Sequence, residues 1–179
     1  MEFLTAFLFG ATYLAFGPTL ESAWYMSFIF ILIITTFVDL EHLIIPQSFI
    51  NAGLILAVSG FIAFWDTRWI SGLIGAVIAA GFLYLSGIFG KALFHKESMG
   101  FGDVLLGLIT GLFLGWKLSI MMLFLTFCSA AVILLILMAF KKIKTGVHVP
   151  FGPFMALGSV LSLFFGEFLI DLYINYVWI

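Results

Sequence analysis

Long apolar stretches, separated by short charged or turn-forming segments, make up almost the whole chain. Seven stretches contain no Asp, Glu, Lys or Arg: Phe3–Leu20, Ser22–Val38, Leu43–Trp65, Trp69–Gly90, Val104–Trp116, Leu118–Phe140 and Val149–Gly166. A helix needs about 20 mostly apolar residues to cross a membrane. The pattern predicts an all-α, polytopic transmembrane bundle of about seven spans (six to seven), in which the stretches at 3–20 and 104–116 are the marginal crossings.

Composition supports this prediction. Of the 179 residues, 64% are hydrophobic and 9% are charged, whereas a soluble domain has about 25% charged residues. This composition excludes a disordered chain and a nucleic-acid-binding protein, and makes membrane lipid the expected surroundings. The lone cysteine, Cys128, cannot form an intrachain disulfide. Because no repeat or low-complexity tract interrupts the pattern, residues 1–179 are expected to form a single membrane domain.

Glycines recur within the fourth apolar stretch, at Gly72, Gly75, Gly81 and Gly87. Small residues allow transmembrane helices to approach closely. An ordinary lipid-facing position is the alternative for each of them.

The basic residues predict the orientation. Five lysines fall after the second, fourth and sixth stretches, and two basic residues fall after the third and fifth: Lys91, Lys96, Lys141, Lys142 and Lys144 against Arg68 and Lys117. Cytoplasmic loops carry an excess of Lys and Arg. The first set is therefore expected in the cytoplasm, with the N-terminus there and the C-terminus on the far side.

Two aspartates stand out from the other acids. Asp39 follows 17 uncharged residues, and Asp103 precedes a run of only 13. Thirteen residues of helix cover about 20 Å, less than the apolar core of about 30 Å, so the span must include Asp103 itself. An ionisable group inside a membrane is by default a functional hypothesis. The alternative is that each aspartate reaches the surface from a helix end.

The pairing of these aspartates suggests a reaction. Both are expected at the cytoplasmic ends of their helices, where two neighbouring carboxyls would share a proton, as aspartic peptide hydrolysis requires. Gly100 and Gly102 would permit positive φ angles and close approach of a substrate backbone. If the helix carrying Asp39 ends there while Asp103 begins one, helix dipoles predict that Asp39 is the acid and Asp103 the base.

Other chemistries lack their motifs. The chain contains no His-Glu-x-x-His, no Gly-x-Ser-x-Gly and no phosphate-binding glycine loop. Its three histidines and one cysteine are scattered, so neither a metal nor a cofactor is expected.

Three segments in order along the chain resemble the type IV prepilin peptidases, membrane aspartic proteases of the Gly-x-Gly-Asp kind. They are residues 38–46 (VDLEHLIIP), 96–103 (KESMGFGD) and 149–158 (VPFGPFMALG). The resemblance covers nearly the whole chain as the catalytic core of that family. It implies that Asp39 and Asp103 are the catalytic pair.

The resemblance also implies a substrate and a location. The substrate would be a prepilin or pseudopilin, whose basic leader is cut after a glycine at the cytoplasmic face of the inner (cytoplasmic) membrane. Glu41 and Glu97 would attract the basic leader, or are simply solvated loop acids. Four residues of the third segment would brace the site, present backbone to the substrate, or form a purely structural turn: Pro150, Phe151, Gly152 and Pro153.

The chain departs from the family pattern in two places. Many relatives carry a cysteine-rich domain, linked with methylation of the new N-terminus, between their first two helices, whereas only a few residues around Gly17-Pro18 join them here. Methylation therefore stays an open question. In addition, Gln47 stands where the family usually has an acid.

Two rival functions remain. A small transporter could use both aspartates as proton or cation sites, although no inverted repeat of the motif is present. A presenilin-like intramembrane protease also uses Gly-x-Gly-Asp, but its Tyr-Asp partner is missing, because Val38 precedes Asp39. The oligomeric state is not set by the sequence.

Overall fold

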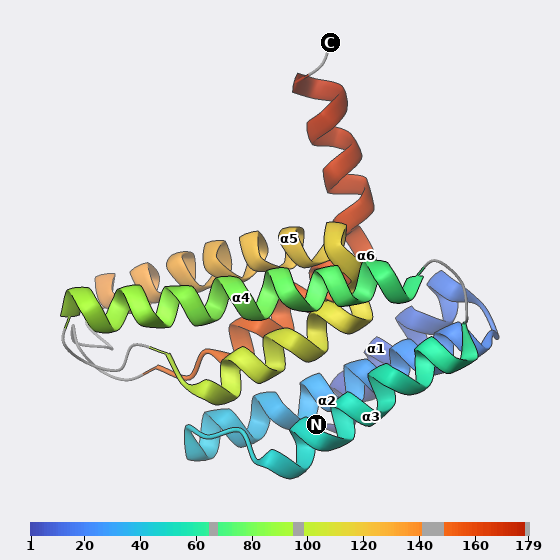
Figure 1. The fold of residues 1–179 in the computed structure, drawn as a ribbon, viewed down its shortest axis with the longest axis horizontal. Coiled ribbons are helices and arrows are strands. Elements are labelled where there is room, and N and C mark those ends of the chain that lie inside the picture. The colour runs from blue at the N-terminus through green and yellow to red at the C-terminus, as the bar shows by residue number, and fades with distance from the viewer. Residues whose placement is uncertain (65–67, 95–98, 141–148, 178–179) are drawn as a thin grey trace.

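The computed structural model describes residues 1–64, 68–94, 99–140 and 149–177. Within these ranges every regular element is a helix, in the order α1 (Glu2–Phe16), α2 (Leu20–His42), α3 (Gln47–Ala63), α4 (Arg68–Phe94), α5 (Phe101–Ala139) and α6 (Gly152–Val177). The helices pack as an elongated bundle, from which the last part of α6 projects (Figure 1).

The longest helix, α5, is two helical segments joined at Gly115. This glycine has φ 76° and ψ 173°, which are not helical values. In Figure 1 the chain turns back there: the yellow-green first part of α5 runs toward the turn, and the gold second part runs back in this view. Counting the two parts separately, the described residues contain seven helical segments, in agreement with the seven apolar stretches.

Length and composition agree with a membrane bundle. Four helical ranges are long and apolar enough to cross a membrane, and two shorter apolar helices accompany them: Leu20–His42, Trp69–Leu93, Phe101–Ala139 and Gly152–Tyr176, with Glu2–Phe16 and Gln47–Ala63. Large apolar side chains such as Phe3, Leu14 and Phe124 are exposed on the outside, as expected where lipid replaces water. The predicted all-α polytopic bundle is confirmed.

Two helix ends differ from those that the charges suggested. Helix α1 ends at Phe16, because Gly17 turns the chain with φ 70°. Thr19 and Ser22 then form a capping box that starts α2. Helix α6 continues to Val177, past Glu167 and the exposed Asp171. A charge limits how deeply a residue sits in lipid, but an exposed carboxylate does not end a helix.

Some glycines of α4 lie at close helix contacts, and at least one faces outward. A Cβ on Gly72 would lie 2.8 Å from the carbonyl oxygen of Leu112, and one on Gly75 would lie 2.6 Å from that of Gly111, so α4 and α5 approach closely there. By contrast, a Cβ on Gly81 would meet nothing within 4 Å. Close packing is therefore confirmed for Gly72 and Gly75, whereas Gly81 faces open space.

Side-chain hydrogen bonds also join neighbouring helices. The indole Nε1 of Trp24 in α2 donates to the carbonyl oxygen of Leu56 in α3 at 2.8 Å. Ser162 Oγ in α6 donates to the carbonyl oxygen of Leu118 at 2.7 Å. Because lipid offers no hydrogen bonds, such contacts satisfy polar groups that would otherwise be costly.

Candidate active site

Both aspartates lie at one end of the bundle. Asp39 is in the last turn of α2, and Asp103 is in the first turn of α5. Helix α6 also begins at this end, since Gly152 contacts Asp39; Figure 1 shows the end of α2 and the starts of α5 and α6 on the left. We call this region, made of Asp39, Gly100–Asp103 and Gly152, the aspartate end.

The Asp39 carboxylate is held by the start of α6. The side chain is only 5% exposed, and its Oδ2 accepts a hydrogen bond of 2.8 Å from the Gly152 N–H. The first N–H groups of any helix lack partners within the helix. In α6, Gly152 donates to Asp39, Pro153 has no N–H, and the Phe154 N–H donates to the carbonyl oxygen of Phe151 at 3.1 Å.

Glycine is required at position 152 by space. A Cβ there would lie 2.7 Å from Asp39 Oδ2 and 3.3 Å from Asp39 Cβ. Any larger residue would push the carboxylate away or move the start of α6. The contact described for this segment is the one with Asp39, and the three roles expected for the segment stay predictions.

The other members of the third segment anchor this helix start. The Phe151 ring lies 5.6 Å from the Phe127 ring of α5, and Phe127 lies 5.6 Å from Phe82 of α4. Pro150 and Pro153 flank this anchor and are half-buried. The Gly152 donor is therefore fixed by aromatic contacts across α4 and α5. Phe127 carries no motif in the sequence, so only the structure identifies it.

Asp103 occupies the third helical position of α5 and is half-buried. Its backbone N–H donates to the carbonyl oxygen of Gly100 at 3.1 Å. A carboxylate in a first turn is stabilised by the positive end of the helix dipole. The expectation that Asp103 starts a helix is confirmed.

The two glycines beside Asp103 act differently from the expectation. Gly100 has φ −71°, and neither glycine is among the positive-φ residues described, so neither adopts the left-handed backbone that glycine permits. A Cβ on Gly100 would lie 3.2 Å from Asp103 Oδ2, and one on Gly102 would lie 3.1 Å from Ile45 Cβ. They make room for the carboxylate and for the loop after α2, because this helix start packs against the protein itself.

The dipole argument for separate acid and base roles also changes. Helix α2 ends three residues after Asp39, so its negative end is close, as the argument assumed. However, the positive start of α6 meets the same carboxylate through Gly152. Two helix ends of opposite sign act on Asp39, so helix dipoles do not assign it the acid role.

The remaining candidates fall outside this arrangement. Glu41 is exposed, and its Oε2 lies 3.9 Å from Nε2 of the exposed His42, in accordance with a solvated acid. Glu97 lies outside the described residues. Among the described residues, no group of three or more His, Cys, Asp or Glu side chains could hold a metal ion.

A small cavity lies beside the start of α5. It has a volume of about 310 Å³ and lies between α4 and α5, where its lining includes Leu83, Tyr84, Ile88, Met99 and Phe101. Because Phe101 and Val104, the neighbours of Asp103 in the first turn, both line it, an apolar segment bound there would be close to the aspartate end.

Comparison with known proteins identifies the family. The profile of the type IV leader peptidase family matches residues 26–136. The chain is 33% identical to a prepilin leader peptidase/N-methyltransferase of Bacillus subtilis (strain 168), over 97% of this chain and 68% of that protein. Proteins of the same name from Legionella pneumophila and Pseudomonas aeruginosa are 32% and 27% identical, over 90% and 98% of this chain.

The chain spans 56% and 61% of the length of the latter two relatives. No solved structure matches it. The profile match covers more than half of the chain, and the resemblance read from the three segments is confirmed. The chain belongs to the type IV leader peptidase family, a family of membrane peptidases.

Proposed function

We propose that the chain is an aspartic endopeptidase that removes the basic leader of a type IV prepilin or pseudopilin, with Asp39 and Asp103 as its catalytic pair. The observation that carries the proposal is the convergence at one end of the bundle of a buried Asp39 and the Asp103 of a Gly-x-Gly-Asp segment. The two come from segments 64 residues apart in the sequence.

The chemistry requires one carboxylate and one carboxylic acid. The carboxylate takes a proton from water, and the oxygen of that water attacks the carbonyl carbon of the scissile peptide bond. The acid protonates the carbonyl oxygen. When the tetrahedral intermediate collapses, the C–N bond breaks, the leaving amine takes the proton that the first carboxylate received from water, and a hydroxyl proton of the intermediate returns to the other aspartate. The Gly152 N–H keeps Asp39 in position throughout, since it donates to Oδ2.

The substrate class follows from the surroundings of the pair. A prepilin joins a basic leader to an apolar helix, and the cavity next to Asp103, between α4 and α5, has a mostly apolar lining that also includes Lys91 and Tyr84. Cleavage after a glycine on the cytoplasmic side is proposed from the family resemblance together with the count of basic residues. Methylation is outside the proposal, because only Gly17, Pro18 and Thr19 join α1 to α2.

The test is cleavage of a prepilin-like substrate by purified protein in detergent. We expect Asp39→Asn and Asp103→Asn each to lower kcat by at least about 100-fold, as loss of an acid–base group does. Asp171→Asn, an exposed acid on α6, is the matched control and should retain the parent rate. Mass spectrometry of the products would locate the cut and reveal any added methyl group.

The same variants address the rivals. If either Asn variant cleaves at the parent rate while remaining folded, the assignment of the pair is wrong. Flux of protons or cations in vesicles that requires both aspartates, without cleavage, would favour the transporter. A cut within the apolar helix of the substrate would favour the presenilin-like protease.

A further inference from the structure

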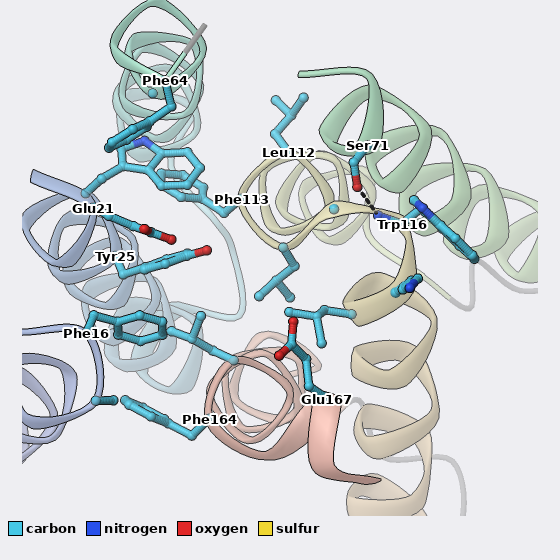
Figure 2. A pocket seen from close by; sticks show the side chains of 18 of the residues that line it. Phe16, Glu21, Tyr25, Phe64, Ser71, Leu112, Phe113, Trp116, Phe164 and Glu167 are labelled. Carbon is cyan, nitrogen blue, oxygen red and sulfur yellow. Dashed lines mark hydrogen bonds between the residues drawn. The ribbon is translucent and has the colours of Figure 1, made fainter. Parts of the chain in front are cut away.

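Helix α6 crosses the bundle before its last part leaves it. Gly152 lies beside Asp39, and Glu167, 15 residues later, lines a cavity of about 610 Å³ together with Glu21 of α2 (Figure 2). Glu21 and Asp39 stand 18 residues apart on α2, which is about 27 Å of helix. That separation is close to the thickness of a bilayer's apolar core, so α6 has reached the opposite headgroup layer at Glu167.

Beyond this level the helix changes direction. In Figure 1 the red end of α6 runs across the direction of α4 and α5 rather than along it. Residues 168–177 are still helical, and ten helical residues cover about 15 Å. A straight continuation along the bundle would carry them about that far into water. The crosswise direction instead keeps them near the depth of the headgroup layer.

The sequence of this part of α6 is amphipathic. Its polar residues recur at every fourth position, at Glu167, Asp171 and Asn175, and a spacing of four places side chains on one face of a helix. The opposite face is apolar and aromatic, and consists of Phe165, Leu169, Tyr173 and Tyr176. Neither lysine nor arginine occurs between residues 165 and 177.

The apolar side chains of this part are exposed in the protein. Those of large size are Phe165, Phe168, Leu172, Tyr173, Ile174 and Tyr176. A contiguous apolar surface of this kind is rare in contact with water. Tyrosine is enriched at membrane–water boundaries, and an amphipathic helix lies in the plane of such a boundary with its apolar face in the lipid. The direction of the helix and its two faces therefore indicate the same surroundings.

We infer that residues 165–176 form an in-plane helix that binds the bilayer interface of the leaflet opposite the aspartates. Glu167, Asp171 and Asn175 face water, and Tyr173 and Tyr176 lie in the lipid. Because the polar face has two acids and no cation, the partner is the apolar boundary of the bilayer rather than an anionic headgroup. The helix thereby holds this end of the bundle at a fixed depth. This inference is independent of the peptidase activity.

The test is the labelling rate of single cysteines by a membrane-impermeant maleimide. The full chain carries Cys128→Ser, which removes its one native cysteine, and is placed as one copy per phosphatidylcholine nanodisc, so that no second copy can cover the helix. Asp171→Cys and Tyr173→Cys form a matched pair, because both positions are exposed in the protein. We expect Asp171→Cys to react at least about 10-fold faster, since a thiol in apolar surroundings stays protonated and unreactive. Rates in sodium dodecyl sulfate, where both should be equal, provide the normalisation.

Two further variants keep the test decisive. Phe124→Cys, at an exposed apolar position of α5, should react as slowly as Tyr173→Cys. Tyr176→Cys, on the same face as Tyr173, replaces that variant if it does not fold. Equal normalised rates on the two faces, whether fast or slow, would overturn the inference. Protection of Tyr173→Cys that appears only when phosphatidylglycerol is added would also overturn it, because the helix would then depend on an anionic headgroup.

Discussion

The two ends of the bundle are built in opposite ways. Around Asp39, at the aspartate end, backbone and side chains pack closely, so that a single added carbon at Gly152 would lie 2.7 Å from the Asp39 carboxylate. At the other end, which we call the Gly115 end (Glu21, Gly115 and Glu167), the helices leave a cavity of about 610 Å³. The larger of the two cavities described is therefore not where the proposed reaction occurs.

This difference indicates which end of the bundle depends on more exact atomic positions. A reaction between two carboxyls and one water depends on positions held to fractions of an ångström. Small changes at the aspartate end should therefore alter the rate, whereas changes at the Gly115 end should alter stability.

Among variants that leave both aspartates in place, the largest effect should come from Gly152→Ala. The new methyl would displace the Asp39 carboxylate from its N–H donor, so kcat should fall by about 10-fold to 100-fold while KM changes little. Cleavage kinetics with the prepilin-like substrate measure kcat and KM separately. Gly81→Ala, a glycine in α4 with no atoms within 4 Å of the added carbon, is the matched control. A parent-like kcat in Gly152→Ala would show that Asp39 does not need this contact.

A smaller effect, confined to stability, is expected from Gly75→Ala. Its new Cβ would lie 2.6 Å from the carbonyl oxygen of Gly111 and 2.7 Å from the backbone of Gly115. Such overpacking costs about 1–3 kcal/mol. Thermal unfolding should show a clear decrease relative to Gly81→Ala, with kcat of the folded fraction retained. A large loss of kcat would mean that the two ends are coupled.

The smallest effect should come from Trp24→Phe. It removes the Nε1 donor to the Leu56 carbonyl, which is worth about 1 kcal/mol of unfolding free energy. Trp69→Phe, at an exposed position near the start of α4, provides the comparison. Unfolding of both variants in the same detergent measures the difference; equal values would show that the α2–α3 hydrogen bond adds no net stability.

Much of the fold could be predicted because charges are costly in lipid. Uncharged stretches had to become apolar helices, and the alternation of their ends placed Asp39 and Asp103 at the same end of the bundle. The break between the stretches at 104–116 and 118–140 also proved real. There Gly115, rather than the neighbouring Lys117, turns the chain.

The contacts between segments could not be predicted in the same way. The hydrogen bond from Gly152 to Asp39 joins residues 113 positions apart, and a local pattern carries no information on which helix start meets which side chain. The packing partners of Gly100 and Gly102 could not be predicted for the same reason. Their neighbours, Asp103 and Ile45, are known only once the helices are packed.

The turn at Gly115 determines the direction, around the axis of α5, in which the Asp103 side chain points. Asp103 precedes it by 12 residues of helix, and the turn is fixed to α4, because Ser71 Oγ accepts the Trp116 N–H at 3.3 Å. Adding or removing one residue in this interval would rotate the carboxylate by about 100° around the helix axis. In this chain, the interval should therefore tolerate substitutions more readily than a change of length.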